Sequence, residues 1–151
     1  MCGIAGLFYF DKDQKISSNL LIKMRDSIAH RGPDDSGIYI DNNLGIAHRR
    51  LSIIDLSSHG HQPMSNFDKS IWIVFNGEFY NYQDYISELQ EKGYAFRSKT
   101  DTEVVLNLYQ EYGIEKTLER INGMFSFAIW DSRIKKMYVC RDRLGIKPLF
   151  Y

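Results

Sequence analysis

The hydrophobic pattern of the chain predicts several strands. Residues 4–10 form an apolar run rich in β-favouring side chains, so the chain enters a strand almost at once. The run at 71–75 has no polar alternation, which is typical of a strand covered on both faces. Further strands are expected at about 37–41, 44–49, 94–97, 124–130 and 136–141.

Apolar residues at helical spacing predict helices between these strands. Ser17 or Ser18 can cap a helix over about 19–29, and Asn81 can cap a second helix. Two more helices are expected at about 102–112 and 114–121. Strands with interspersed helices favour sheets sandwiched between helical layers. No repeat or linker interrupts the pattern, so we expect one domain over residues 1–151.

Composition and charge exclude several classes of protein. The 151 residues are 44% hydrophobic and 25% charged, as in a globular domain with a sizeable core. Lys plus Arg equals Asp plus Glu at 19 each, so no overall charge favours nucleic acid or an anionic membrane. The first apolar run ends too early, at Asp11, for a signal peptide. No run approaches the roughly 18 apolar residues of a membrane helix. We expect a cytoplasmic protein.

The cysteine and histidine content points away from disulfide and metal sites. Two cysteines are too few for a disulfide framework, although a Cys2–Cys140 bridge is conceivable. Cys140 lies in a strand-like run and is expected to be a small buried hydrophobe. His59 and His61 have no third ligand at a useful spacing, so we expect no metal.

Cys2 is the most informative residue for chemistry. Removal of Met1 would leave a first residue with both a thiol and a free α-amine. A thiol titrates near about 8.5 and an α-amine near about 7.7–8.0, so the amine can take the thiol proton at neutral pH. The alternative is a cysteine in a frayed terminus, but a terminus that continues into a strand is held in place.

Other polar residues each have a structural and a catalytic interpretation. Asn76-Gly77 is either a hairpin turn or an oxyanion hole, in which an amide side chain and a backbone N–H face one developing charge. Arg49 and Arg50 end a strand, so only one of them can face a given pocket, where it could clamp a carboxylate. The segment 31–34 is either a turn or a mobile loop over a site.

Asp101 is similarly ambiguous. Thr100 with Glu103 makes a capping box at the start of a helix, and Asp101 in the first turn suits the helix dipole. A carboxylate at this position could also bind a substrate ammonium. The spacing alone does not choose between these roles.

Taken together, the motifs resemble the glutaminase domain of class II glutamine amidotransferases, in the asparagine synthetase branch. The resemblance covers nearly the whole chain. It rests on Cys2-Gly3-Ile4-Ala5-Gly6, Arg31-Gly32-Pro33-Asp34, Ala47-His48-Arg49-Arg50-Leu51-Ser52-Ile53-Ile54-Asp55, His61-Gln62-Pro63-Met64, Asn76-Gly77-Glu78-Phe79-Tyr80-Asn81, Asp101-Thr102-Glu103 and Arg141-Asp142-Arg143-Leu144-Gly145-Ile146-Lys147-Pro148-Leu149. Related sugar-phosphate and purine amidotransferases would carry a His-Thr-Arg block where this chain has His48-Arg49-Arg50, which favours the asparagine synthetase branch.

The resemblance implies an α+β fold of the N-terminal-nucleophile hydrolase type, a four-layer αββα sandwich of two mainly antiparallel sheets. It also implies that the chain hydrolyses L-glutamine to glutamate and ammonia through a Cys2 thioester. The catalytic residues would be Cys2, Asn76 and Gly77. The substrate-binding residues would be Arg50 for the α-carboxylate, Asp101 with Glu78 for the ammonium, and Ile53, Ile54, Asn76 and Gly77 along the pocket.

The same resemblance implies a partner. The family continues with an ATP-dependent synthetase domain, in the same or an associated chain, and these residues contain no Ser-Gly-Gly-x-Asp-Ser pyrophosphate loop. ATP and Mg are therefore expected only for that domain, and no cofactor for this one. We expect the chain to be a fragment that lacks the last strands of the sandwich.

Three further points stay open. The same glutaminase could serve a sugar or cell-envelope acceptor. The chain could also be a glutamine-binding module that does not hydrolyse its ligand. A homodimer is compatible with the family.

Overall fold

The computed structural model describes residues 1–151 and places seven strands in two antiparallel sheets. The first sheet has the order β1-β3-β2, with strands Gly3–Phe8, Leu44–Arg50 and Asp35–Asp41. The second has the order β4-β5-β6-β7, with strands Met64–Ser65, Ile71–Phe79, Gly123–Asp131 and Lys136–Arg141.

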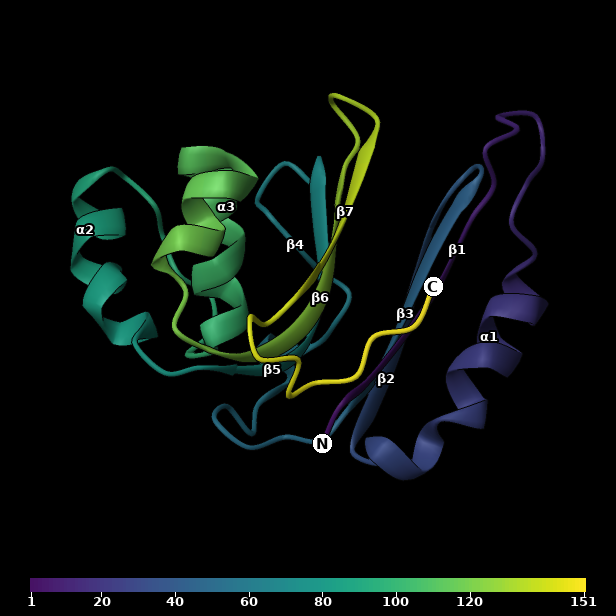
Figure 1. The fold of residues 1–151 in the computed structure, drawn as a ribbon, viewed down its shortest axis with the longest axis horizontal. Coiled ribbons are helices and arrows are strands. Elements are labelled where there is room, and N and C mark those ends of the chain that lie inside the picture. Colours follow the sequence, from purple (N-terminus) through teal and green to yellow (C-terminus); the bar gives the residue numbers. More distant parts are fainter.

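Helices cover the outer faces of the two sheets (Figure 1). Helix α1 (Ser18–Ser27), followed by the 3-10 turn η1 (Ala29–Arg31), packs on the first sheet. Helix α3 (Asp101–Arg120) packs on the second sheet, with α2 (Ile86–Glu91) and η3 (Tyr82–Tyr85) beside it. A further turn, η2, spans Ser58–Gly60. The layers are therefore α, β, β, α, and the expected α+β sandwich is confirmed.

Strand β5 is buried on both faces, as its lack of polar alternation predicted. Ile71, Ile73 and Phe75 face the helical layer, in a cluster of buried residues that includes side chains of α3. Val74 points to the opposite face, toward Leu44 of the first sheet. Each such side chain contributes about 1.5–3 kcal/mol by burial, so β5 is held firmly between the layers.

The predicted helix starts at Ser17 and Thr100 are confirmed. Ser17 Oγ accepts the N–H of Leu20 at 3.4 Å, and Thr100 Oγ1 accepts the N–H of Glu103 at 3.3 Å. The capping box is only half formed, because the Glu103 carboxylate accepts N–H groups of the preceding loop instead. Gly113, with φ of 76°, interrupts α3 between the two helices that the pattern predicted.

Three sequence-based expectations about local structure are wrong. The segment 94–97 is not a strand, because the N–H of Arg97 bonds the Glu103 side chain rather than a neighbouring strand. Asn81 does not cap a helix, since its side chain bonds Arg120 O and the N–H of Asn122. Strand β5 continues past residue 75 to Phe79.

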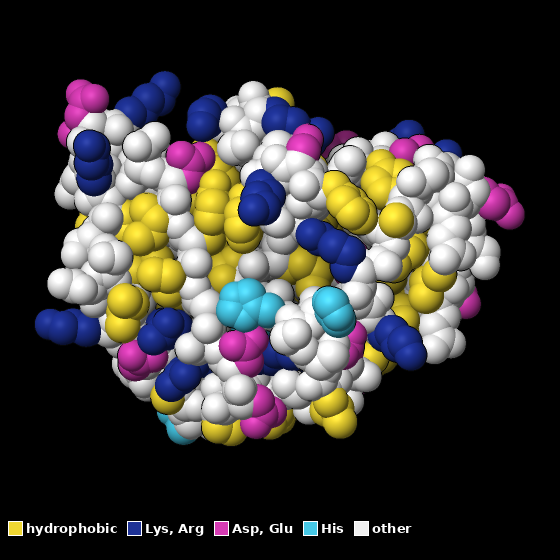
Figure 2. Space-filling model, turned by 180° about the vertical axis from the view of Figure 1, so that it is seen from behind, with side chains coloured by type: hydrophobic (Ala, Val, Ile, Leu, Met, Phe, Trp, Pro, Cys, Tyr) yellow, Lys and Arg dark blue, Asp and Glu magenta, His cyan; other side chains and the backbone are white.

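The face of the molecule shown in Figure 2 has no region dominated by one sign of charge. On the face shown in Figure 2, basic and acidic side chains are interspersed with patches of hydrophobic ones, in keeping with their equal numbers in the sequence. None of the helices has both the length and the apolar character needed to cross a bilayer.

Candidate active site

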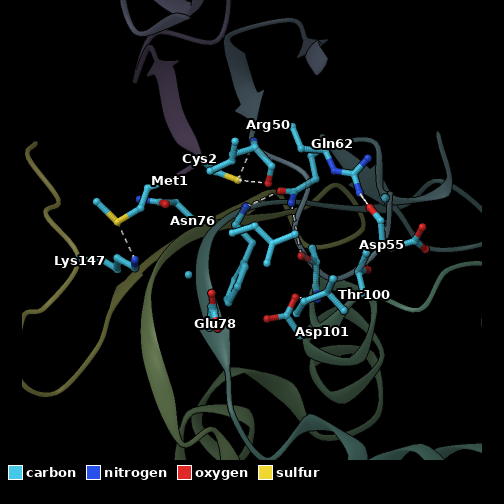
Figure 3. A pocket seen from close by; sticks show the side chains of 17 residues that line it. Met1, Cys2, Arg50, Asp55, Gln62, Asn76, Glu78, Thr100, Asp101 and Lys147 are labelled. Carbon is cyan, nitrogen blue, oxygen red and sulfur yellow. Dashed lines mark hydrogen bonds between the residues drawn. The ribbon is translucent and has the colours of Figure 1, made fainter. Parts of the chain in front are cut away.

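A cavity lies where the chain start meets the ends of β3 and β5 and the first turn of α3 (Figure 3). Its volume is about 70 Å³. Every residue that the sequence assigned to a site lines it: Cys2, Arg50, Ile53, Ile54, Asn76, Gly77, Glu78 and Asp101. These residues come from separate parts of the chain, so the fold brings them together.

Cys2 is held on both sides of its backbone and at its sulfur. Gly3 begins β1 and pairs with Arg49 of β3. The Arg31 Nε donates to the Cys2 carbonyl oxygen at 3.0 Å. The N–H of Leu51 lies 3.4 Å from the sulfur and donates to it. The terminus is therefore ordered against its neighbours, and the frayed-terminus interpretation is wrong.

The thiol of Cys2 is not self-activating in this environment. Burial raises its pKa above the ordinary value, and this effect outweighs the opposing Leu51 N–H and the nearby Arg50 cation. A thiol in this state is mainly protonated at neutral pH and needs a base to become a nucleophile.

Asn76 presents a buried amide to the cavity. Its Nδ2 lies 3.5 Å from the hydroxyl of Ser126, the residue that faces it on β6, and this long hydrogen bond leaves the amide free to serve a second acceptor.

The N–H of Gly77 points toward the cavity edge of β5. Alternate N–H groups of a strand share one edge. On that edge the N–H of Phe75 donates to Gln62 Oε1 at 2.6 Å and the N–H of Phe79 donates to Asp101 Oδ2 at 2.9 Å. Gly77 lies between them, so its N–H faces the space between Gln62 and Asp101. The Asn76 amide and this N–H thus form the two-donor arrangement of an oxyanion hole.

Asn76-Gly77 is not a hairpin turn, because both residues pair with β6 within a continuous strand. A Cβ at position 77 would collide with the carbonyl oxygen of Met124. Glycine is therefore required here by the close approach of the neighbouring strand.

Arg50 lines the cavity and Arg49 does not, as the alternation of a strand requires. The buried Arg50 guanidinium donates to Ser57 O at 2.8 Å and to Asp55 O. Gly60 packs against it, and a Cβ there would collide with Arg50 Nη2. Arg49 instead lies 3.7 Å from Asp26, outside the cavity.

Asp101 is a buried carboxylate with no cationic partner. It is 4% exposed and accepts the N–H groups of Phe79 and Thr102 at 2.9 and 2.8 Å. Burial raises its pKa to about 6, with a further contribution from the negative charge of Glu78, against the opposing backbone hydrogen bonds. Neither carboxylate forms an ion pair in the chain, so this wall is suited to an ammonium ligand.

Ile53 and Ile54 occupy the rim. The two residues are 59% and 41% exposed, in the irregular segment after β3. Their backbone groups can bind a ligand at the mouth of the cavity and their side chains can cover it, but they do not form the floor of the cavity.

The segment 31–34 supports the site from outside the cavity. The Arg31 side chain holds the Cys2 carbonyl, and Asp34 Oδ2 accepts the N–H of Ser52 at 2.8 Å. The N–H of Asp34 also bonds Arg50 O at 3.0 Å. These hydrogen bonds hold the segment against Cys2 and the end of β3.

His61 and Cys140 lie outside the cavity and have structural surroundings. His61 Nδ1 lies 2.8 Å from Asp35 Oδ2. Cys2 and Cys140 are both free, so the conceivable bridge is not formed. Burial raises the pKa of the Cys140 thiol to about 11, which leaves it unreactive.

Several cavity residues were given no role in a site from the sequence. They are Met1, Leu51, Asp55, Gly60, Gln62, Phe75, Thr100, Thr102 and Lys147. Gln62 is central among them, since it links the N–H of Phe75 to Thr102 Oγ1 across the cavity wall. Its only sequence signal is a polar residue inside a motif that carried the family resemblance.

Comparison with known proteins agrees with this geometry. Residues 1–151 match the family described as the glutamine amidotransferase domain. The chain is 45% identical to asparagine synthetase [glutamine-hydrolyzing] 1 of Bacillus subtilis, over all of this chain and 24% of that protein. It is 38% identical to asparagine synthetase [glutamine-hydrolyzing] of Zea mays, over 99% of this chain and 25% of that protein. The chain thus spans about a quarter of the length of these relatives.

A solved structure shares the fold. Glutamine phosphoribosylpyrophosphate amidotransferase from B. subtilis, complexed with ADP and GMP, superposes with a TM-score of 0.79 at 18% identity. The match covers 96% of this chain and 38% of that one.

Proposed function

The chain belongs to the glutamine amidotransferase domain family, and from that membership we propose that it hydrolyses the side-chain amide of L-glutamine to glutamate and ammonia. The observation that carries this proposal is the cavity itself. It is lined by Cys2 with its sulfur, by the buried Asn76 amide, by Gly77 with its N–H on the cavity edge of β5, and by the Asp101 carboxylate. We propose no cofactor for this step, because protein groups and water supply the chemistry.

The first step requires removal of Met1. The freed α-amine of Cys2 accepts the thiol proton, and the thiolate attacks the glutamine carboxamide carbon. The negative charge that develops on the carbonyl oxygen is stabilised by the Asn76 amide and the Gly77 N–H. The protonated amine then returns its proton to the leaving nitrogen, so ammonia departs and a glutamyl thioester remains. Water attacks the thioester, with the amine again as base, to release glutamate and restore the thiol.

The ends of the cavity select the amino-acid portion of the substrate. The Arg50 guanidinium bonds two loop carbonyls and retains further N–H groups for a substrate α-carboxylate. Asp101 and Glu78 carry negative charge without an ion-pair partner, so they can bind the substrate ammonium. Opposite charges at the two ends orient glutamine with its carboxamide toward Cys2.

The released ammonia would serve a second domain. Because the curated relatives are named asparagine synthetases and are longer, we propose a synthetase domain, in the same or an associated chain, that uses ATP to convert aspartate to asparagine. ATP and Mg would bind to that domain. We propose a cytoplasmic location for the whole enzyme.

The decisive experiment measures glutamate and ammonia released from glutamine by the purified protein, after intact mass has shown that Met1 is absent. We expect the two products in equal amounts, and Cys2→Ala to abolish release while glutamine still binds. Glutamine binding without release in the Met1-free wild type would instead indicate a non-hydrolytic binding module. Ammonia transfer to a sugar or cell-envelope intermediate, rather than to aspartate, would overturn the asparagine synthetase assignment.

A further inference from the structure

Lys147 is a buried cation beside the amino terminus. It lies in the segment after β7, is 4% exposed and lines the same cavity as Cys2. Its Nζ donates to Met1 Sδ at 3.0 Å (Figure 3). No carboxylate lies within ion-pair distance of it. A thioether is a weak acceptor, so this contact does not explain why a cation is buried here.

The backbone around Lys147 is fixed by its neighbours. The buried Asp142 carboxylate accepts the N–H groups of Ile146, Lys147 and Phe125 at 2.8, 2.9 and 3.2 Å. Arg141 Nε donates to the Lys147 carbonyl at 2.7 Å. These hydrogen bonds fix the backbone from which the Lys147 side chain extends.

Removal of Met1 changes what the ammonium faces. The Met1 side chain leaves the cavity, and the nitrogen that joined Met1 to Cys2 becomes a free amine. That nitrogen is separated from Met1 Sδ only by the backbone and side-chain bonds of residue 1. The Lys147 ammonium, which contacts the end of the Met1 side chain, therefore shares one cavity with the residue that carries the new amine.

We propose that the Lys147 ammonium keeps the α-amine of Cys2 in its neutral, proton-accepting form, an inference that rests on the proposed glutaminase function. Two neighbouring cations repel, so a fixed ammonium disfavours protonation of an adjacent amine. Lys147 therefore acts on the protonation state of the Cys2 amine and does not contact the substrate, so it is a positioning residue rather than a catalytic one.

The other charged groups around the cavity do not replace this effect. Glu78 on β5 and Asp101 on α3 favour a protonated amine, and a bound substrate ammonium offsets one of these two negative charges. Arg50 on β3 disfavours it, but the substrate carboxylate neutralises that charge. Asp55 in the rim segment bonds the N–H groups of Lys99 and Ser57 and faces away from the amine (Figure 3).

One more cation and one titratable group adjoin the amine. Arg31 on η1 donates to the Cys2 carbonyl and also disfavours protonation. The Cys2 thiol is neutral until it gives up its proton. With substrate bound, Lys147 is therefore the cation lining the cavity whose charge no substrate group offsets.

The test is the pH profile of kcat for glutamine hydrolysis in Met1-free protein, since this profile reports groups in the substrate complex. We expect Lys147→Met to raise the midpoint of the acidic limb by about one pH unit, and so to lower kcat about tenfold below that midpoint. Lys147→Arg should restore the wild-type midpoint. Lys136→Met removes one charge from the exposed start of β7 and should match the wild type.

An unchanged midpoint in Lys147→Met, or an equal loss of kcat at every pH, would overturn the proposal. A second measurement covers a variant that fails to fold. The Cys2 amine of the wild type is acylated with acetic anhydride across the pH range and compared with the free peptide 2–8. A lower midpoint in the protein supports the proposal, and an equal or higher one overturns it. A wild type that releases no glutamate would defeat the proposed function, while this titration would still show whether the amine is held in its neutral form.

Discussion

The backbone N–H of Leu51 donates to the sulfur of Cys2 across 3.4 Å, although the two residues are far apart in the sequence. The contact arises because β1 pairs with β3, which places residue 2 beside the end of β3. This N–H orients the sulfur and opposes the effect of burial on the thiol pKa, but burial dominates. The thiol therefore depends on a base, which in the proposed mechanism is its own α-amine.

This dependence predicts that an N-terminal extension abolishes catalysis without unfolding the protein. A variant with two residues inserted between Met1 and Cys2 keeps the thiol but converts the amine into an amide. We expect kcat to fall at least about 10²-fold, the usual contribution of a general base. Glutamate release measures the loss, and an unchanged melting temperature serves as the control. Full activity in the extended chain would exclude the amine as the base.

Neighbouring arginines of β3 provide a matched pair for testing the carboxylate clamp. Arg50→Lys keeps the charge but loses the planar donor fork, whereas Arg49→Lys makes the same change outside the cavity. A lost charge-assisted hydrogen bond costs about 1.5–3 kcal/mol, so we expect the glutamine KM of Arg50→Lys to rise roughly 10- to 100-fold. Arg49→Lys should keep the wild-type KM. Similar KM values for the two variants would move the clamp elsewhere.

Asp101 should make glutamine binding dependent on pH. Burial raises its pKa to about 6, so above this pH the carboxylate is ionised and can hold the substrate ammonium. Below it the group becomes neutral, and we expect affinity to fall toward about tenfold per pH unit. Calorimetric titration of glutamine into the inactive Cys2→Ala protein, from about pH 5 to 8, measures this.

The matching variant separates Asp101 from other titrating groups. Asp101→Asn should bind glutamine weakly with little change across the same range. A pH dependence that persists in this variant would assign the effect to another group, with Glu78 the first to examine.

Asn76 should affect the chemical step more than binding. Asn76→Ala removes one of two donors to the developing oxyanion, and such losses lower kcat by about 10²–10³. Ser126→Ala removes only the weak 3.5 Å partner of the amide and should cost much less. Steady-state kinetics of both variants test this, and a raised KM with normal kcat in Asn76→Ala would contradict an oxyanion role.

The sequence predicted the layers from local pattern, and it predicted the members of the site from the motifs that carry the family resemblance. Periodicity identified β5 as doubly covered, and its burial against Leu44 on one side and the α3 layer on the other follows from that. The motifs identified Cys2, Asn76 and Asp101, and the fold places all of them on one cavity.

The errors arise where a side chain takes over a backbone partner. Glu103 accepts the N–H groups of the 94–97 region, so that segment forms no strand. Asn81 bridges to the end of α3 instead of capping a helix, a contact that depends on the tertiary fold. The contact of Lys147 with Met1 also depends on the tertiary fold, because no local pattern reports that residue 147 reaches residue 1.

His48 should make the stability of the protein fall in acid. The ring is fully buried and its Nε2 lies 3.1 Å from Phe75 O, so Nε2 carries the proton of a neutral imidazole. Burial lowers its pKa from 6.5 to about 4. The unfolded chain takes up a proton below about 6.5 that the folded chain resists, so this contribution is present above that pH and is lost as the pH falls to about 4.

The expected loss over this window is about 3 kcal/mol in the free energy of unfolding. Urea unfolding of the wild type and of His48→Gln at about pH 7.5 and 4 isolates the effect, because Gln keeps a donor for Phe75 O but does not titrate. Protonation of Asp101 acts in the opposite direction in both proteins and cancels in the comparison. The exposed His59→Gln is the matched control and should lose as much stability as the wild type. If His48→Gln also loses as much stability in acid as the wild type, His48 is not the group that couples folding to pH.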